Sequence, residues 1–204
     1  MRITWHGHSC FSVATDAGTA VFDPYEDGSV PGLAPLRLTA DAVYCSHGHH
    51  DHCAAQLVTL SGAPFTAQVD EIGAYHDDKL GLLRGRNTIR VLHAEGMRVV
   101  HMGDIGHIPS AGKLKQLQGA DVLMIPVGGV YTVDAKTAHE IVSRIQPRIV
   151  FPMHYRLGKM GYDVLAELAE YTAMCDNVCS YDTDSVEITP DTPAQTIVVK
   201  YNGK

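Results

Sequence analysis

Apolar positions along this chain fall into short runs, several of which alternate with polar positions, and into a few longer stretches with helical spacing. Short runs bounded by Gly, Pro, Asn or Asp are typical of β-strands. They predict strands over residues 3–13, 19–22, 42–45, 64–68, 88–92, 98–102, 121–126, 148–152, 186–189 and 196–199. Turn signals at Asp16-Ala17-Gly18 and Glu95-Gly96 predict hairpins between the strands on either side.

The amphipathic stretches predict helices over residues 53–60, 111–117, 134–145 and 162–174. Strands and helices alternate in two similar halves with no obvious linker, which predicts one domain spanning residues 1–204. Two sheets packed face to face with helices outside would bury the apolar runs, and a doubly wound sheet would do so as well. The pattern alone therefore predicts an α/β fold and leaves its layering open.

Composition narrows the class of protein. Hydrophobic residues make up 45% of the chain and charged residues 19%, as in globular rather than disordered proteins. The net charge of −7 provides no broad positive field for phosphate backbones, so we do not expect a nucleic-acid partner. No stretch resembles a signal peptide or a membrane span. The five cysteines lack a Cys-x-x-Cys pair and indicate reduced thiols, so we predict a cytoplasmic protein without a membrane partner.

Histidine is abundant, and its densest cluster follows the predicted strand over residues 42–45. The pattern there is His47-x-His49-x-Asp51-His52. Imidazole and carboxylate groups are the usual ligands of Zn²⁺ and similar divalent ions. Because so tight a loop cannot direct every side chain at one ion, we expect His47 and His49 to face one metal. The other two ligands would then face a second, as in two-metal hydrolases. The alternative is a surface loop that is rich in histidine for no functional reason.

This motif, placed after an apolar strand, resembles the signature of the metallo-β-lactamase superfamily. The resemblance implies a four-layer αβ/βα sandwich with a metal site at the rim between its two sheets. It also implies metal chemistry. Lactonases, phosphodiesterases, thioesterases, glyoxalase II enzymes and nucleases share this scaffold, so the resemblance says little about the substrate.

Further ligands follow from the same resemblance. It implies that Asp104, in a Gly-Asp turn, bridges both metals, and that His154, after the strand over 148–152, binds the second. The alternatives are an aspartate in an ordinary turn and a hydrogen-bonded core histidine. The first metal needs one more histidine, for which His76, His93 and, less favourably, His101 are candidates. We choose His76, because His93 lies beside the hairpin turn, roughly 20 Å along the returning strand from Asp104.

The predicted metal ligands are therefore His47, His49, Asp51, His52, His76, Asp104 and His154. As catalytic residues we predict Asp51, which would also hold the attacking hydroxide in line, and His107, which would act on the substrate unless it is a surface histidine.

Several residues are expected around these ligands. We expect His8 near the metals, through a hydrogen bond or a substrate contact, and Asp23 either orienting a ligand imidazole or capping a turn. Asp77 and Asp78 are interpreted as a surface charge pair. Cations that could meet an anionic substrate are Arg84, Arg86, Arg156 and Lys159.

The sequence thus predicts a metal-dependent hydrolase with two divalent ions, Zn²⁺ or alternatively Mn²⁺ or Fe²⁺. A metal-bound hydroxide would cleave a small ester, lactone or related substrate, which could be anionic. Oxygen-reducing di-iron relatives usually have Glu at the position of His49, so the histidine favours hydrolysis. The alternatives are a phosphodiesterase acting on small phosphodiesters or nucleic acid, and a non-catalytic metal-binding module. A homo-oligomer is also left open.

Overall fold

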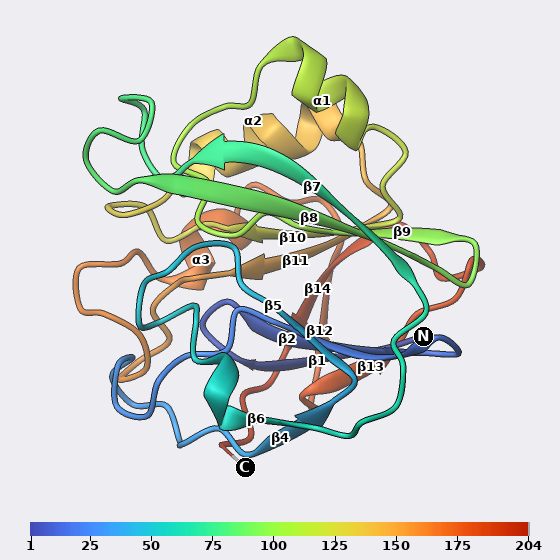
Figure 1. Cartoon of the computed structure of the whole chain (residues 1–204). Helices are drawn as coiled ribbons and strands as arrows, with labels where there is room; N and C mark the ends of the chain where they lie inside the picture. Colours follow the sequence, from blue (N-terminus) through green and yellow to red (C-terminus); the bar gives the residue numbers. More distant parts are fainter. Residues whose placement is uncertain (204) are drawn as a thin grey trace.

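Two large β-sheets face each other in the computed structural model, which describes residues 1–203 (Figure 1). The five-stranded sheet has the order β13-β1-β2-β3-β5, and the seven-stranded sheet has the order β12-β14-β11-β10-β9-β8-β7. The first sheet consists of β13 (Ser185–Glu187), β1 (Arg2–Gly7), β2 (Cys10–Thr15), β3 (Gly18–Phe22) and β5 (Ala42–Tyr44). The second consists of β12 (Val178–Tyr181), β14 (Gln195–Val199), β11 (Ile149–Met153), β10 (Val122–Pro126), β9 (Met97–His101), β8 (Arg86–Ala94) and β7 (Gln68–Tyr75).

The main hydrophobic core lies between the sheets. β1 alternates buried and less buried residues, with Ile3 and Trp5 turned inward, as expected for a strand with one covered face. β10 and β11 are buried along their whole length, because helices cover the other face of their sheet (Figure 1). These helices are α1 (Ala111–Leu117) and α2 (Ala135–Ile145).

The outer face of the five-stranded sheet is covered differently. A ribbon of β4 (Leu38–Ala40) and β6 (Val58–Leu60) lies beneath it, together with the loop over residues 24–37 (Figure 1). A second, smaller cluster of buried residues joins this layer to β2 and β3 through Cys10, Val21, Val30 and Val58.

Strand direction brings chain segments to one rim. β1 and β3 both run antiparallel to β2, and β5 runs parallel to β3, so these three end on the same side. In the other sheet β7, β9, β10 and β11 share one direction, because β8 is antiparallel to both β7 and β9. Residues that follow these strands therefore gather at the rim, as the resemblance implied.

Some predicted elements differ from the structure. Residues 53–60 do not form a short helix: a 3₁₀ turn over Ala55–Leu57 leads into β6, which pairs with β4. The strand predicted over residues 64–68 begins only at Gln68 and continues to Tyr75. The strands β4 and β12 were not predicted.

The helix predicted over residues 162–174 is wrong in its first half, since α3 covers only Leu168–Thr172. The backbone N–H of Ala166 donates to Gly128 O, and the Tyr162 hydroxyl donates to Ser29 O at 3.0 Å. These tertiary hydrogen bonds tie the segment to neighbouring loops and override its helical pattern. Within residues 1–203, no helix has the length and apolar character needed to cross a membrane.

Candidate metal centre

Polar side chains that follow strand ends of both sheets meet at this rim. His8 follows β1, Asp23 follows β3, residues 47–52 follow β5, His76 follows β7, Asp104 follows β9 and His154 follows β11. Their donor atoms form two main groups, within each of which all atoms lie within 4.8 Å of one another. The first group is His47, His49 and His76, and the second is His8, Asp51, His52 and His154.

In the first group, neutral hydrogen-bonding groups hold the imidazoles. The Ser46 hydroxyl lies 2.8 Å from Nδ1 of His47, and Nδ1 of His76 donates to the carbonyl oxygen of Tyr131 at 3.1 Å. These contacts occupy the Nδ1 atoms and leave Nε2 of both rings directed into the site. Nε2 of His76 lies 3.2 Å from Asp104 Oδ2.

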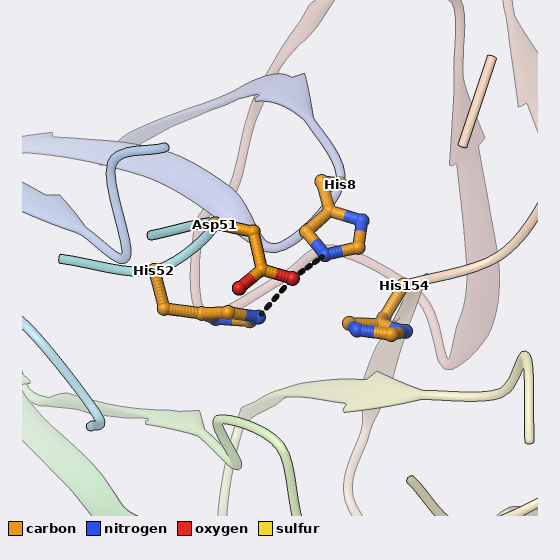
Figure 2. A group of neighbouring side chains, drawn as sticks. All are labelled: His8, Asp51, His52 and His154. Atoms are coloured by element: carbon orange, nitrogen blue, oxygen red, sulfur yellow. Dashed lines mark hydrogen bonds and ion pairs between the residues drawn. The ribbon is translucent and has the colours of Figure 1, made fainter. Parts of the chain in front are cut away.

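In the second group His8, His52 and His154 are buried and Asp51 is half-buried, and Figure 2 shows how the four side chains lie. Nδ1 of His52 donates to Asp23 Oδ2 at 2.8 Å, and Nε2 of His8 lies 3.3 Å from Asp51 Oδ2. Figure 2 shows the ring of His154 on the opposite side of this cluster from the His52 backbone. The His8 and His154 rings have their centroids 4.0 Å apart.

Asp104 lies between the two groups. Its Oδ2 is 3.1 Å from Nε2 of His52, 3.2 Å from Nε2 of His76 and 3.2 Å from Nε2 of His154. These spacings would fit a ligand shell, because ligands bound tetrahedrally at about 2.0–2.1 Å lie roughly 3.3 Å from one another.

Polar atoms that lack a hydrogen-bond partner also indicate a metal site. Within residues 1–203, Nε2 of His47 and Oδ1 of Asp104 are buried without a hydrogen-bond partner, and Nε2 of His52 and His154 have only the contacts to Asp104, which lack hydrogen-bond geometry. Buried polar atoms are normally hydrogen-bonded, and leaving one unsatisfied is costly. The nitrogen-rich donor set, its convergence on one carboxylate and these free atoms fit two divalent metal ions.

The backbone at Asp104 is fixed by close packing. Gly103 has φ of +55°, and a Cβ at this position would overlap Asn87 and Ser46. Asn87 Oδ1 accepts the N–H of Asp104 at 2.9 Å, while its Nδ2 donates to Met102 O at 2.8 Å. Asn87 is a site residue that sequence reasoning missed, because an asparagine next to a predicted strand carries no distinctive signal.

Asp23 orients ligands rather than only capping a turn. Its carboxylate accepts the Ser46 N–H and hydroxyl, each at 2.6 Å, in addition to Nδ1 of His52. Although burial opposes ionisation, nearby His101 and His52 keep the pKa of Asp23 below its usual value. The carboxylate therefore stays charged and fixes both the motif backbone and the tautomer of His52.

The remaining charges are arranged around Asp104. Burial disfavours its ionised form, yet His154 and His52 hold its pKa well below the usual range. The pKa of His52 is well above its ordinary value, despite burial, because Asp104 and Asp23 flank it. Burial and the neighbouring His52 lower the pKa of His47 to about 3. Burial and His154 lower that of His8 to about 4. The neutral ring of His47 is therefore ready to bind a metal, whereas a metal bound to His52 would have to displace a proton from its ring.

The two other candidates for the first metal, His93 and His101, lie away from the cluster. His93 pairs with Asp70 at 2.9 Å near the far end of the β8–β9 hairpin. His101 is buried, but its Nε2 donates to Ser9 O and its Nδ1 accepts the N–H of Gly103. The structure thus brings His76 to Asp104, and neither His93 nor His101 offers a free nitrogen there.

The prediction that His107 acts on the substrate is not supported by its position. Its Nδ1 donates to Ile108 O at 2.9 Å, and its Nε2 accepts the Tyr75 N–H at 3.3 Å. Both ring nitrogens are therefore used by the backbone, and His107 does not line the cavity over the site.

The interpretation of Asp77 as a surface charge is wrong. Asp77 is buried, and its carboxylate accepts four backbone N–H bonds of the loop that follows β7, from Lys79, Gly81, Leu83 and Arg84. Asp78 is exposed and pairs with Lys79, as expected.

A cavity of about 330 Å³ opens over the cluster. Its lining residues are His49, Asp51, His76, Arg84, Asp104, Tyr131, His154 and Tyr162. Of the four predicted cations, Arg84 lines it, whereas Arg156 is paired with Glu167 at 3.0 Å. The Tyr162 hydroxyl oxygen lies 3.2 Å from Asp51 Oδ2, so its one proton is shared between this carboxylate and Ser29 O. Sequence reasoning assigned no role to Tyr162 because it was placed within a helix.

Residues 2–154 match the model of a family described as the beta-lactamase superfamily domain. The chain belongs to the metallo-β-lactamase superfamily. A UPF0173 metal-dependent hydrolase of Thermoplasma acidophilum is 27% identical, covering 89% of this chain and 93% of the relative. A UPF0173 protein of Pyrococcus furiosus is 32% identical, covering 76% of this chain and 83% of the relative.

A solved structure gives the same result. The chain resembles a crystal structure described as a Zn-dependent hydrolase of the metallo-β-lactamase superfamily from Thermotoga maritima, with a TM-score of 0.77 and 27% identity. The match covers 97% of each chain. The predicted superfamily and fold class are thereby confirmed, and so is the enzyme class, a metal-dependent hydrolase.

Proposed function

We propose that this metallo-β-lactamase family member uses two divalent metal ions to hydrolyse a small ester or lactone. The substrate would bind in the cavity above the ions. The first ion is held by His47, His49 and His76, and the second by Asp51, His52 and His154. Asp104 is shared between the two ions. The observation that carries this proposal is the position of Asp104 Oδ2, within 3.2 Å of imidazole nitrogens from both groups.

The donor set supports zinc as the resident metal. Imidazole nitrogens dominate both groups. Nitrogen-rich sites suit Zn²⁺, with Mn²⁺ or Fe²⁺ as alternatives, whereas Mg²⁺ and Ca²⁺ prefer all-oxygen sites. When bound, two such ions polarise the scissile bond and lower the pKa of a water molecule towards neutrality.

The chain's own residues supply orientation. Asp51 lines the cavity, and its Oδ2 is fixed by His8 and by the Tyr162 hydroxyl, so the carboxylate can hold the attacking water in line. Burial and the nearby Asp51 raise the pKa of Tyr162, which keeps its hydroxyl protonated and able to donate a hydrogen bond. Arg84 provides a positive charge at the cavity wall for a carbonyl or an anionic group.

The size and charge of the site favour a small molecule. A cavity of about 330 Å³ accommodates one small ligand. The net charge of −7 opposes long nucleic acids. The position of Arg84 at the cavity wall favours a second candidate, a phosphodiesterase acting on small phosphodiesters, because its positive charge could bind a phosphate.

The test is a substrate panel assayed with protein loaded with Zn²⁺, Mn²⁺ or Fe²⁺. The panel contains lactones, carboxylic esters, thioesters and phosphodiesters, and His47→Ala/His49→Ala serves as the metal-site control. We expect cleavage of carboxylic esters or lactones that the control loses. Hydrolysis of phosphodiesters alone would favour the second candidate. Two bound ions without any hydrolysis would indicate a non-catalytic metal-binding module.

A further inference from the structure

Exposed apolar side chains lie on three loops that also carry residues of the cavity wall. They are Leu80, Leu82, Leu83, Val130 and Val164, and we call them the apolar rim. Leu82 is 86% exposed and Val130 is 57% exposed. A scattered exposed leucine needs no explanation, but a cluster around a functional cavity indicates a binding surface.

The loops that carry the rim meet at the cavity itself. The Arg84 guanidinium lies 5.6 Å from the centroid of the Tyr131 ring, and the Tyr131 and Tyr162 rings are 5.9 Å apart. All three residues line the cavity, and each lies within two residues of a member of the rim. Figure 1 shows the loops after β7, β10 and β11 on the same side of the two sheets.

Backbone conformation sets two members of the rim apart. Leu80 and Val130 both have φ of +58°, in the left-handed region. This region is unfavourable for non-glycine residues and especially for a β-branched one. Because both side chains are exposed, they recover little of this cost by packing in the fold. Strain of this kind clusters at binding sites, where the strained residue serves a ligand.

The loop with the three leucines is held in place from beneath. The four backbone N–H bonds to the Asp77 carboxylate fold residues 77–84 into a defined turn. The N–H of His76 also donates to Gly85 O at 3.1 Å, which closes the base of the loop. The leucines are therefore presented to solvent by an ordered scaffold, and ordering them costs a ligand little.

We propose that the apolar rim binds a hydrocarbon chain of the substrate, so that the preferred substrate is an ester or lactone with a medium-length acyl or alkyl chain. This inference rests on the proposed hydrolase function and names its substrate class. The polar head reaches Asp104 and Arg84 in the cavity, and the chain lies outward across Leu80 and Val130.

Charge favours a substrate chain over other apolar partners. Arg84 lies among the rim residues, and a second protein copy or a lipid surface would have to remove it from water without an obvious counter-charge. Asp78 and Lys79 are exposed beside Leu80 and would also be covered by such a partner. A substrate chain can contact the leucines and leave Asp78 and Lys79 hydrated, while its polar head meets Arg84.

The test measures binding separately from catalysis. Zinc-loaded protein is titrated calorimetrically with straight-chain carboxylates from butanoate to decanoate, and kcat/KM is measured for p-nitrophenyl esters of the same lengths. Each added methylene should tighten binding by about 2- to 4-fold. The double variant Leu80→Asn/Val130→Asn should flatten this dependence. Asparagine tolerates the left-handed region, so the variant should melt at the same temperature as the parent or higher.

A matched control is Leu60→Asn, because Leu60 is an exposed leucine on β6, away from the cavity. It should keep the chain-length dependence of the parent. A flat dependence in the parent, or an unchanged one in the double variant, would overturn the proposal. Self-association or binding to phosphatidylcholine vesicles that the double variant abolishes would overturn it as well, by assigning the rim to a second copy or to a lipid surface.

The two proposals can fail separately. Chain-length-dependent binding without ester hydrolysis would retain the hydrocarbon site and refute the hydrolase. Ester hydrolysis with no dependence on chain length would retain the hydrolase and refute the role of the rim.

Discussion

The two groups of candidate ligands differ in what holds them. In the first group His49 is exposed at the cavity, and the supports of His47 and His76 are a hydroxyl and a backbone carbonyl. In the second group His52 and His154 are fully buried, and Asp23 supports His52 through a carboxylate. A carboxylate partner raises the basicity of a ligand imidazole more than a neutral one does.

Because of this difference, we expect the two half-sites to bind metal with different affinities. Burial slows exchange with solvent, and the carboxylate support strengthens binding, so the second group should retain its ion longer. The first group, open to the cavity, is better placed to exchange ligands during turnover. The predictions below test this asymmetry, beginning with the largest expected effect.

His76→Ala should remove the ion of the first group and leave that of the second. Activity should fall by at least about 100-fold, because a two-metal mechanism needs both ions. His93→Ala is the matched control, since His93 lies on the same sheet and is paired with Asp70 rather than Asp104. Metal content by elemental analysis and kcat/KM are the readouts. Equal metal content in His76→Ala and the parent would refute the assignment of His76.

Asp23→Asn should weaken the second ion more than the first, whose ligand His47 depends on Asp23 only through the Ser46 hydroxyl. The substitution keeps the size of the side chain but removes the charge that supports Nδ1 of His52. Loss of such a supporting group typically lowers metal affinity by about 10- to 100-fold. Competition with a chromophoric chelator measures both affinities. If the first ion weakens instead, the proposed pairing of supports with half-sites is wrong.

His8→Asn should have a smaller effect on the same ion. His8 has φ of +52°, which asparagine tolerates, so the fold should be retained. The variant loses the contact between His8 Nε2 and Asp51 Oδ2, while the Tyr162 hydroxyl still holds that oxygen. We expect the affinity for the second ion to fall by less than about 10-fold. A loss as large as that in Asp23→Asn would make His8 itself a ligand.

The smallest effect is expected far from the ligands, at the cap of α2. Asp134 accepts the Thr137 N–H at 2.8 Å, and this bond holds the pKa of Asp134 below its ordinary 3.8. A lowered folded-state pKa means that the cap stabilises the fold above pH 3.8 and that this contribution is lost as the pH falls through the folded-state pKa. Asp134→Ala should therefore cost about 1 kcal/mol at pH 7.

Urea unfolding at several pH values checks this prediction. The difference between Asp134→Ala and the parent should shrink towards pH 3, and both ions should still bind at pH 7. A pH-independent difference would show that the charged cap is not its cause. Loss of either ion would mean that this helix also positions the site.

The sequence predicted the parts of the site that depend on strand ends. The resemblance implied the ligand roles of Asp104 and His154, and their positions after apolar runs supported it, because strands of one direction deliver their ends to the same rim. The choice of His76 over His93 rested on strand length and on the resemblance of the loop around His76, and the structure brings His76 rather than His93 next to Asp104.

Residues fixed by long-range contacts could not be predicted in this way. Asp77 looked like a surface charge because its four partners are backbone N–H groups of a loop whose path the sequence does not reveal. Tyr162 was assigned to a helix because the pattern of the residues after it is helical. In the structure the contacts of its hydroxyl with Ser29 and Asp51, which are distant in sequence, prevail over that pattern. The sequence also carries no sign of the backbone contacts that occupy both ring nitrogens of His107.

The most direct test of the account is anomalous diffraction from crystals of the zinc-loaded protein. We predict two zinc peaks, one among His47, His49 and His76 and one among Asp51, His52 and His154, with Asp104 contacting both. Brief soaking in a chelator should weaken the first peak before the second. A single peak, or an ion placed among Asp23, His47 and His52, whose donor atoms also lie within 4.8 Å of one another, would contradict the two-metal site.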